Sequence, residues 1–213
     1  MALSFPLPWS EFGALLPVQS APWTLKRFEQ VTWSGSSVPN VAELSDPRWR
    51  CRVTLDVMDA DEASELRTLF ELHGSGHPLL LHDPARPGPR LDRDGSLLGA
   101  AAPTLATVSA TGFSLKGLPP AYALSRGDLV SVVHGTAARR ALYVLAEGAS
   151  ANGSGVTPQI RVLPAPRLIA AADHTVDLIN PTGLMLVLPD SYEPGQSSGT
   201  VVRGMGFDAV EAW

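Results

Sequence analysis

Three histidines followed by an aspartate are the first residues of this sequence whose types could support chemistry. His73, His77 and His82 lie close together along the chain, and Asp83 follows directly. Imidazole and carboxylate groups are common ligands of zinc, but two ligands on one helix face require an unbroken helix between them. A glycine-containing turn at 74–76 separates His73 from His77. We therefore interpret this segment as a helix end and a turn, with His73 near the negative end of the helix dipole, and expect no metal site.

The acidic segment that begins at Asp92 is similar to the first half of a calcium-binding loop. Asp92, Asp94 and Ser96 alternate along it, as the first ligands of such a loop do. The twelfth position counted from Asp92 should then hold a glutamate, but it holds Pro103. The Asp-Gly pair at 94–95 is also typical of a tight β-hairpin turn. We expect a hairpin turn here and no calcium.

The patterns that mark nucleophilic catalysis and nucleotide binding do not support an enzyme. We expect no nucleophile elbow, and the chain has neither a glycine-rich phosphate-binding loop nor a dinucleotide-binding fingerprint. Cys51 falls on the apolar face of an expected strand, where a thiol usually belongs to the core. Because it is the one cysteine, it excludes an intramolecular disulfide and a multi-cysteine zinc site. The residues predict neither catalysis nor a bound cofactor.

Composition and charge set further limits on function. The 213 residues include 16 Lys and Arg against 21 Asp and Glu, and the net charge of −5 disfavours binding to nucleic acid through its phosphates. Hydrophobic residues make up 45% of the chain, and its 19 Gly and 19 Pro favour short strands and turns over a helical bundle. The sequence has no stretch of about 18 uncharged apolar residues and no convincing signal peptide, so we expect no membrane insertion and synthesis in the cytoplasm.

Hydrophobic spacing predicts the elements that must position these residues. Strict alternation predicts a half-buried strand over 50–57, and a less regular pattern predicts another over 23–33. The polar stretch 34–46 is expected to be a long loop. A helix is predicted over 59–73, and a buried strand over 78–81 follows it. The helix carries one apolar stripe, formed by Ala63, Leu66, Leu69 and Phe70.

The pattern of residues changes after a proline-rich connector at 82–90. From there to about residue 180, short β segments alternate with glycine-rich turns, as in a small barrel or sandwich. A late strand at 184–188 would have no partner at the end of such a barrel. We therefore predict a mainly β fold with one short helix, in which residues 1–83 with 182–213 form a β-sandwich-like domain and residues 91–180 form an inserted small β-barrel domain.

The order of several motifs resembles a known family. A strand at 49–57 leads into the helix that starts at Ala60-Asp-Glu-Ala, and then into Pro78-Leu-Leu-Leu-His-Asp-Pro84. Further along, Leu124-Ser-Arg-Gly-Asp128 is followed by Ile160-Arg-Val-Leu-Pro and Asn180-Pro-Thr-Gly-Leu. In this order the motifs resemble the distal tail proteins, and related tail-tip proteins, of long-tailed phages and gene transfer agents. The resemblance covers most of residues 23–213.

This resemblance implies a structural protein of the virion without catalytic residues. Members of the family form a homohexameric ring at the end of the tail tube and connect the tube to the hub or to the host-recognition apparatus. The implied partners are therefore the tail tube protein, the tail hub protein and the tape-measure protein inside the tail. The implied location is the virion tail tip, after assembly in the host cytoplasm.

The expected loop 35–46 is longer than a simple connection requires. We expect it to reach a neighbouring subunit across a head-to-tail contact that closes into a ring. The interface residues predicted on this basis are Trp33, Gly35, Pro39, Asn40 and Asp46.

Two other classes of protein stay open at this point. A carbohydrate-binding module that recognises host surface sugar would expose two or three aromatic rings on one sheet face, and the five tryptophans supply candidates. A hydrolase would instead bring histidine and aspartate side chains together in one pocket.

Overall fold

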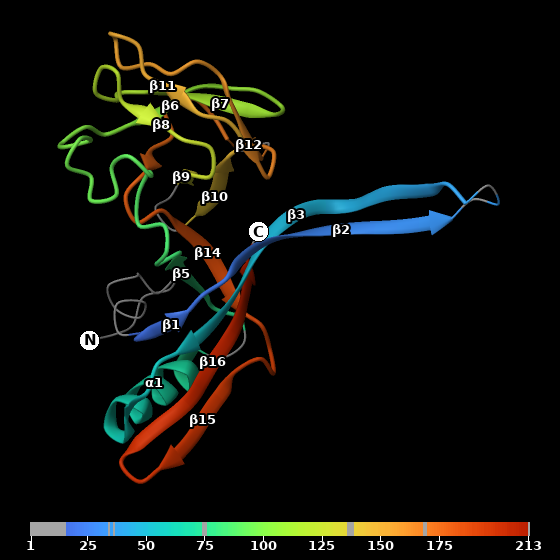
Figure 1. Ribbon diagram of the computed structural model, residues 1–213, viewed down its shortest axis with the longest axis vertical. Helices are drawn as coiled ribbons and strands as arrows, with labels where there is room; N and C mark the ends of the chain where they lie inside the picture. Colours follow the sequence, from blue (N-terminus) through green and yellow to red (C-terminus); the bar gives the residue numbers. More distant parts are fainter. Residues whose placement is uncertain are drawn as a thin grey trace.

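The structure is a computed structural model, and it describes residues 16–33, 35, 37–73, 76–135, 139–167 and 170–212, with the backbone alone at positions 72 and 73. The chain is mainly β, with 50% of its residues in strands and 6% in helix, which confirms the predicted fold class. Two antiparallel sheets form the body, and a long two-stranded arm projects from it (Figure 1).

The first sheet combines strands from both ends of the chain. Its central path contains β1 (Val18–Ser20), β3 (Pro39–Leu55), β16 (Val201–Glu211), β14 (Thr182–Val187) and β5 (Pro78–His82), in that order. Three more strands pair with this path: β2 (Trp23–Trp33) with β3, and both β4 (Met58–Asp59) and β15 (Glu193–Ser198) with β16. Cys51, Val53 and Leu55 of β3 are buried as their alternation predicts, whereas Val57 lies beyond the strand end and is exposed.

Helix α1 (Ala60–His73) packs on one face of this sheet (Figure 1). Its apolar stripe is in contact with the sheet as predicted, with Ala63, Leu66 and Phe70 buried and Leu69 half-buried. Phe70 stacks on Tyr192, with ring centroids 4.4 Å apart, and meets Phe207 edge to face at 5.0 Å. Within the described ranges, no helix is long and apolar enough to span a bilayer.

Residues 34–46 are not the long loop that their polarity predicts. Strand β3 begins at Pro39, and Pro39 to Ala42 pair in register with Trp33 to Gln30 of β2. The connection between the two strands is therefore short, and most of the expected loop is one side of a β-hairpin. The error has a physical cause: both faces of this hairpin are exposed, so burial imposes no alternation on its sequence.

The second sheet is built from the middle of the chain and closes on itself. Its order is β13 (Val176–Asp177), β9 (Leu129–Val133), β10 (Arg140–Leu145), β12 (Ile160–Leu163), β7 (Gly112–Lys116) and β6 (Thr104–Val108). A bridge between Thr104 and Thr175 joins the two ends of this order, which gives a small barrel. A separate pair, β8 (Ala123–Leu124) and β11 (Ala149–Ser150), lies beside it. Its core, centred on Phe113, Tyr143 and Ile160, is distinct from that of the first sheet.

The middle segment enters and leaves the first sheet at neighbouring points. His82 at the end of β5 pairs with Thr182 at the start of β14, and the Asn180 N–H donates to the Pro87 carbonyl at 2.6 Å. The chain thus leaves the first sheet after His82 and returns to it at Thr182, close to the boundaries expected for an insertion. That residues 91–180 form an independently folding domain stays a prediction.

Candidate functional site

The five predicted interface residues all lie on the β2–β3 hairpin. We call residues 27–46 the arm, because in this range β3 pairs with β2 alone, whereas from Arg50 onward it also pairs with β16. Trp33 and Pro39 face each other across the tip, Gly35 is in the turn, and Asn40 pairs with Thr32. Asp46 lies apart from these four, at the foot of the arm.

One face of the outer arm is an apolar strip. Residues directly opposite in an antiparallel pair share a face, and alternate residues along each strand share it too. Trp33 opposite Pro39 and Val31 opposite Val41 therefore form a single row. Trp33 is 71% exposed, Val41 59% and Val31 51%. We call these four residues the apolar strip.

Two irregularities in the β2–β3 register interrupt the alternation below this strip. They lie on either side of Phe28, so that Leu44 is an extra residue on β3. Leu44 is left exposed, and the Lys26 ammonium lies 5.3 Å from the centroid of the Phe28 ring. Both bulges place their extra residue on β3, so they interrupt the alternation of that strand and not the alternation of β2.

An isolated two-stranded ribbon is marginally stable in water, and the arm also leaves both of its outer strand edges unpaired. From Arg27 to Trp33 it extends roughly 20 Å at the rise of an antiparallel strand. A ribbon of this length with a row of exposed apolar side chains is typical of a surface that becomes covered on assembly. The arm is therefore the strongest candidate for a functional site.

The foot of the arm is fixed to the barrel by a small apolar cluster. Trp49 of β3 packs with Leu129 and Leu142 of the barrel, and its indole N–H donates to the Leu142 carbonyl at 2.7 Å. Trp23 of β2 meets Trp49 edge to face, with ring centroids 6.4 Å apart. Because of these contacts, the barrel helps to fix the direction in which the arm projects.

A buried ion pair lies next to this cluster. The fully buried Glu211 carboxylate contacts the Arg167 guanidinium at 2.9 Å. It also accepts a hydrogen bond from the backbone N–H of Trp49 at 3.4 Å. Burial raises the pKa of Glu211, and Arg167 together with backbone N–H groups opposes that shift. The pair joins the last strand of the first sheet to the barrel segment that follows β12.

Asp46 and Glu43 face this barrel segment across a cleft of about 210 Å³. Arg27 lines the arm side of the cleft, and Pro164 and Arg167 line the barrel side. The charges in the cleft are mixed, two guanidinium groups against two carboxylates, so it has no single-sign preference for a ligand. The structure therefore separates Asp46 from the tip residues by position and by surroundings.

In the part of the chain that the structure describes, no group of three or more side chains that could hold a metal ion is found. His77 is exposed. Burial lowers the pKa of His82, and the charge of the neighbouring Asp83 only partly opposes this shift. Asp83 itself forms an ion pair with Arg86 at 2.7 Å. The side chain of His73 lies outside the described residues. A hydrolase would bring histidine and aspartate side chains into one pocket, but His82 and Asp83 line two different cavities.

Asp92 has a structural role in place of the calcium ligation considered above. Its carboxylate accepts hydrogen bonds from the N–H groups of Leu97 and Leu98 and from the Tyr122 hydroxyl, each at 2.9 Å. Burial opposes its ionisation, but these hydrogen bonds outweigh burial and lower the pKa of Asp92. The segment is a series of turns between β5 and β6, so the expected Asp-Gly hairpin is wrong.

Replacing Asp92 by alanine should destabilise the barrel by about 1–3 kcal/mol, because buried donors lose their acceptor. Urea unfolding followed by circular dichroism would measure the loss. Tyr122→Phe removes one of the three hydrogen bonds and should cost less than Asp92→Ala. An Asp92→Ala variant as stable as the parent chain would contradict this assignment.

Two further positions bear on the expectation of no nucleophile. Burial raises the pKa of Cys51 to about 12, so its thiol stays protonated near neutral pH. Contrary to that expectation, residues 195–199 fit the pattern Gly-x-Ser-x-Gly. Residues 195–198 belong to the exposed strand β15 and Gly199 to the turn into β16, so they do not form the strand-to-helix turn of a nucleophile elbow.

The aromatic residues of the barrel do not provide a sugar-binding platform. The three aromatic side chains between residues 91 and 180 are Phe113, Tyr122 and Tyr143, and all are buried. Among the described tryptophans, Trp49 is buried, Trp23 is half-buried and Trp33 is exposed at the arm tip. Stacking on sugar needs exposed rings that share one face, so this arrangement does not favour a carbohydrate-binding module.

The sequence was also compared with known proteins. No protein-family model matches the chain, and a search of curated proteins found no significant match.

Proposed function

We propose that this protein is a structural subunit of a phage or phage-like tail tip, which assembles into a homohexameric ring and connects the tail tube to the hub or host-recognition apparatus. The observation that carries the proposal is the arm, because its apolar strip is exposed and a two-stranded ribbon needs a partner surface. The order of sequence motifs supports the specific assignment to the tail tip.

The form of the molecule also favours a heterologous contact over a two-fold one. The arm projects from one side of the first sheet, while α1 lies on that sheet far from the arm tip (Figure 1). A head-to-tail contact uses two different surfaces of each subunit, and it forms a closed ring when the rotation between neighbours closes. An arm that leaves its own subunit provides one of these two surfaces.

The oligomeric state of the purified protein tests this proposal. Native mass spectrometry and electron microscopy should show a hexamer with a central channel for the parent chain. The double variant Trp33→Lys/Val41→Lys should be a folded monomer with the same circular dichroism spectrum as the parent chain, because both residues are exposed in the isolated subunit.

Leu97→Lys is the matched control, since it also places a lysine at an exposed leucine, but on the barrel side of the molecule. It should leave the hexamer intact. A parent chain that stays monomeric at high concentration would refute the ring, and glycan-array binding by that monomer would support the carbohydrate-binding alternative. A hexameric double variant would remove the arm from the interface.

A further inference from the structure

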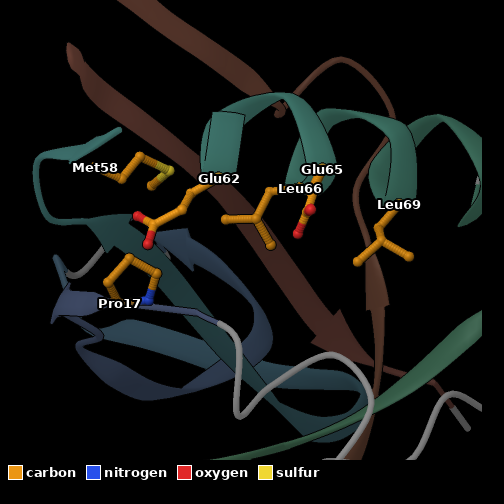
Figure 2. A pocket seen from close by; sticks show the side chains of 6 residues that line it. All are labelled: Pro17, Met58, Glu62, Glu65, Leu66 and Leu69. Carbon is orange, nitrogen blue, oxygen red and sulfur yellow. The ribbon is translucent and has the colours of Figure 1, made fainter. Parts of the chain in front are cut away.

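A groove beside α1 is the feature that the proposed ring leaves without a role. It has a volume of about 250 Å³ and lies between the helix, the end of the segment before β1, and β4 (Figure 2). Its lining consists of Pro17, Met58, Glu62, Glu65, Leu66 and Leu69. Met58 and Leu66 are buried at its floor, while Glu62 and Glu65 are exposed.

The chemistry of this lining is selective. Four of the six side chains are apolar, and the two polar ones are carboxylates, which accept hydrogen bonds but donate none when ionised. A group that fits has an apolar body and a hydrogen-bond donor at its edge. An indole ring meets both requirements, because its N–H is a donor and the rest of the ring is apolar.

Trp33 is the one aromatic residue among the exposed large apolar side chains of the described chain. It stands at the arm tip, and residues 31–42 around it include no charged residue. The tip can therefore approach Glu62 and Glu65 without like-charge repulsion. The lower arm is less suitable, because its three carboxylates, Glu29, Glu43 and Asp46, outnumber its one cation, Arg27.

The arm cannot fill the groove of its own subunit, because it points away from α1 (Figure 1). The tip and the groove are thus two different, complementary surfaces on separate parts of one molecule, which is what a head-to-tail contact requires. We propose that Trp33 of one copy inserts into the groove beside α1 of the next copy, with its indole N–H donating to Glu62 or Glu65. This inference rests on the proposed ring and names the surface that receives the arm.

Cysteine cross-linking between two different variants tests the contact. Pro39 lies directly opposite Trp33 on the same face of the arm, so a cysteine at position 39 reports the contact while Trp33 is kept. A mixture of Pro39→Cys and Glu65→Cys proteins should form an intermolecular disulfide under mild oxidation, seen as a band of doubled mass that a reductant removes. The native Cys51 does not interfere, because it is buried. The controls are each variant alone and a mixture of Pro39→Cys with Leu97→Cys, all of which should give little cross-linking.

Charge and donor variants give a second measurement. Glu62→Lys/Glu65→Lys should weaken hexamer association about tenfold or more, since the indole donor then meets cations in place of acceptors. Trp33→Phe keeps an aromatic ring without the donor and should weaken it less than Trp33→Ala. Arg67→Ala, on the same helix but bonded to the Pro194 carbonyl outside the groove, should leave association unchanged.

The outcomes separate the two proposals. If the parent chain is a hexamer but the paired cysteines cross-link no better than the controls, the groove is not the receiving surface and the ring stands. If the parent chain is a monomer and no cross-link forms, both proposals fail. Selective cross-linking together with weakened hexamers in the Glu62→Lys/Glu65→Lys variant supports both.

Discussion

Replacing Arg167 by alanine should lower the free energy of unfolding by about 3–5 kcal/mol at neutral pH. The reason is the fully buried carboxylate of Glu211, which contacts the Arg167 guanidinium at 2.9 Å. Without that cation, Glu211 must either remain charged in an apolar surrounding or take up a proton. Both alternatives lower the free energy of unfolding. The contact that is lost links the first sheet to the barrel.

The pH dependence of this loss identifies its origin. Burial already raises the pKa of Glu211 in the folded protein, and removal of Arg167 raises it further. A carboxyl group whose folded pKa lies above its unfolded pKa binds more protons in the folded state, so stability falls as pH rises between the two values. The destabilisation by Arg167→Ala should therefore be larger at pH 7.5 than at pH 5.

Urea unfolding of the variant and its parent at both pH values measures this effect. The matched control is Arg167→Ala/Glu211→Gln, which removes both charges and should be more stable than Arg167→Ala at pH 7.5. It should also lose the added pH dependence. Equal destabilisation by Arg167→Ala at both pH values would show that lost packing of the arginine, and not the buried charge, is responsible.

Residues with one buried face were predictable from the sequence. Alternation located Cys51, Val53 and Leu55 on the inner side of β3, and the helical stripe located Ala63, Leu66 and Phe70 against the sheet. In both cases burial against a core imposes the period of the element on the sequence. These positions hold the first sheet together, and they were read correctly for that reason.

The arm illustrates the opposite case. Its residues have no core on either side, so residues 37–46 had the composition of a loop, and the hairpin was missed. The prediction that this segment serves as an interface was argued from the length of the expected loop, so it shared that error. The structure gives it a different basis, because Trp33 and Pro39 face each other at one exposed tip. That the tip is an interface stays a prediction.

Long-range pairing accounts for the remaining features that the sequence did not reveal. Glu211 and Arg167 are far apart in the chain, and so are Trp49 and Leu142. Each pair meets where the first sheet contacts the barrel. The groove beside α1 is likewise formed by three separate segments. The local pattern of a sequence carries no information about such long-range contacts.

Phe70→Ala should cost about 3–5 kcal/mol of stability, the range for removing a buried phenylalanine. Phe70 is buried between α1 and the first sheet, where it stacks on Tyr192 and meets Phe207 edge to face. The substitution removes two ring contacts and leaves a cavity beneath the helix, because β16 holds the backbone of Phe207 in place. Thermal and urea unfolding would measure the loss.

Phe28→Ala is the matched control, since it makes the same chemical change at a half-buried position on the arm. It should cost about 1 kcal/mol or less, because little apolar surface is removed from the core. The difference between the two variants thus reports how tightly α1 is docked, which also determines whether Glu62 and Glu65 are held rigidly enough to receive a partner. If Phe70→Ala cost no more than Phe28→Ala, α1 would be loosely attached, and a groove that depends on its position could not form a stable contact.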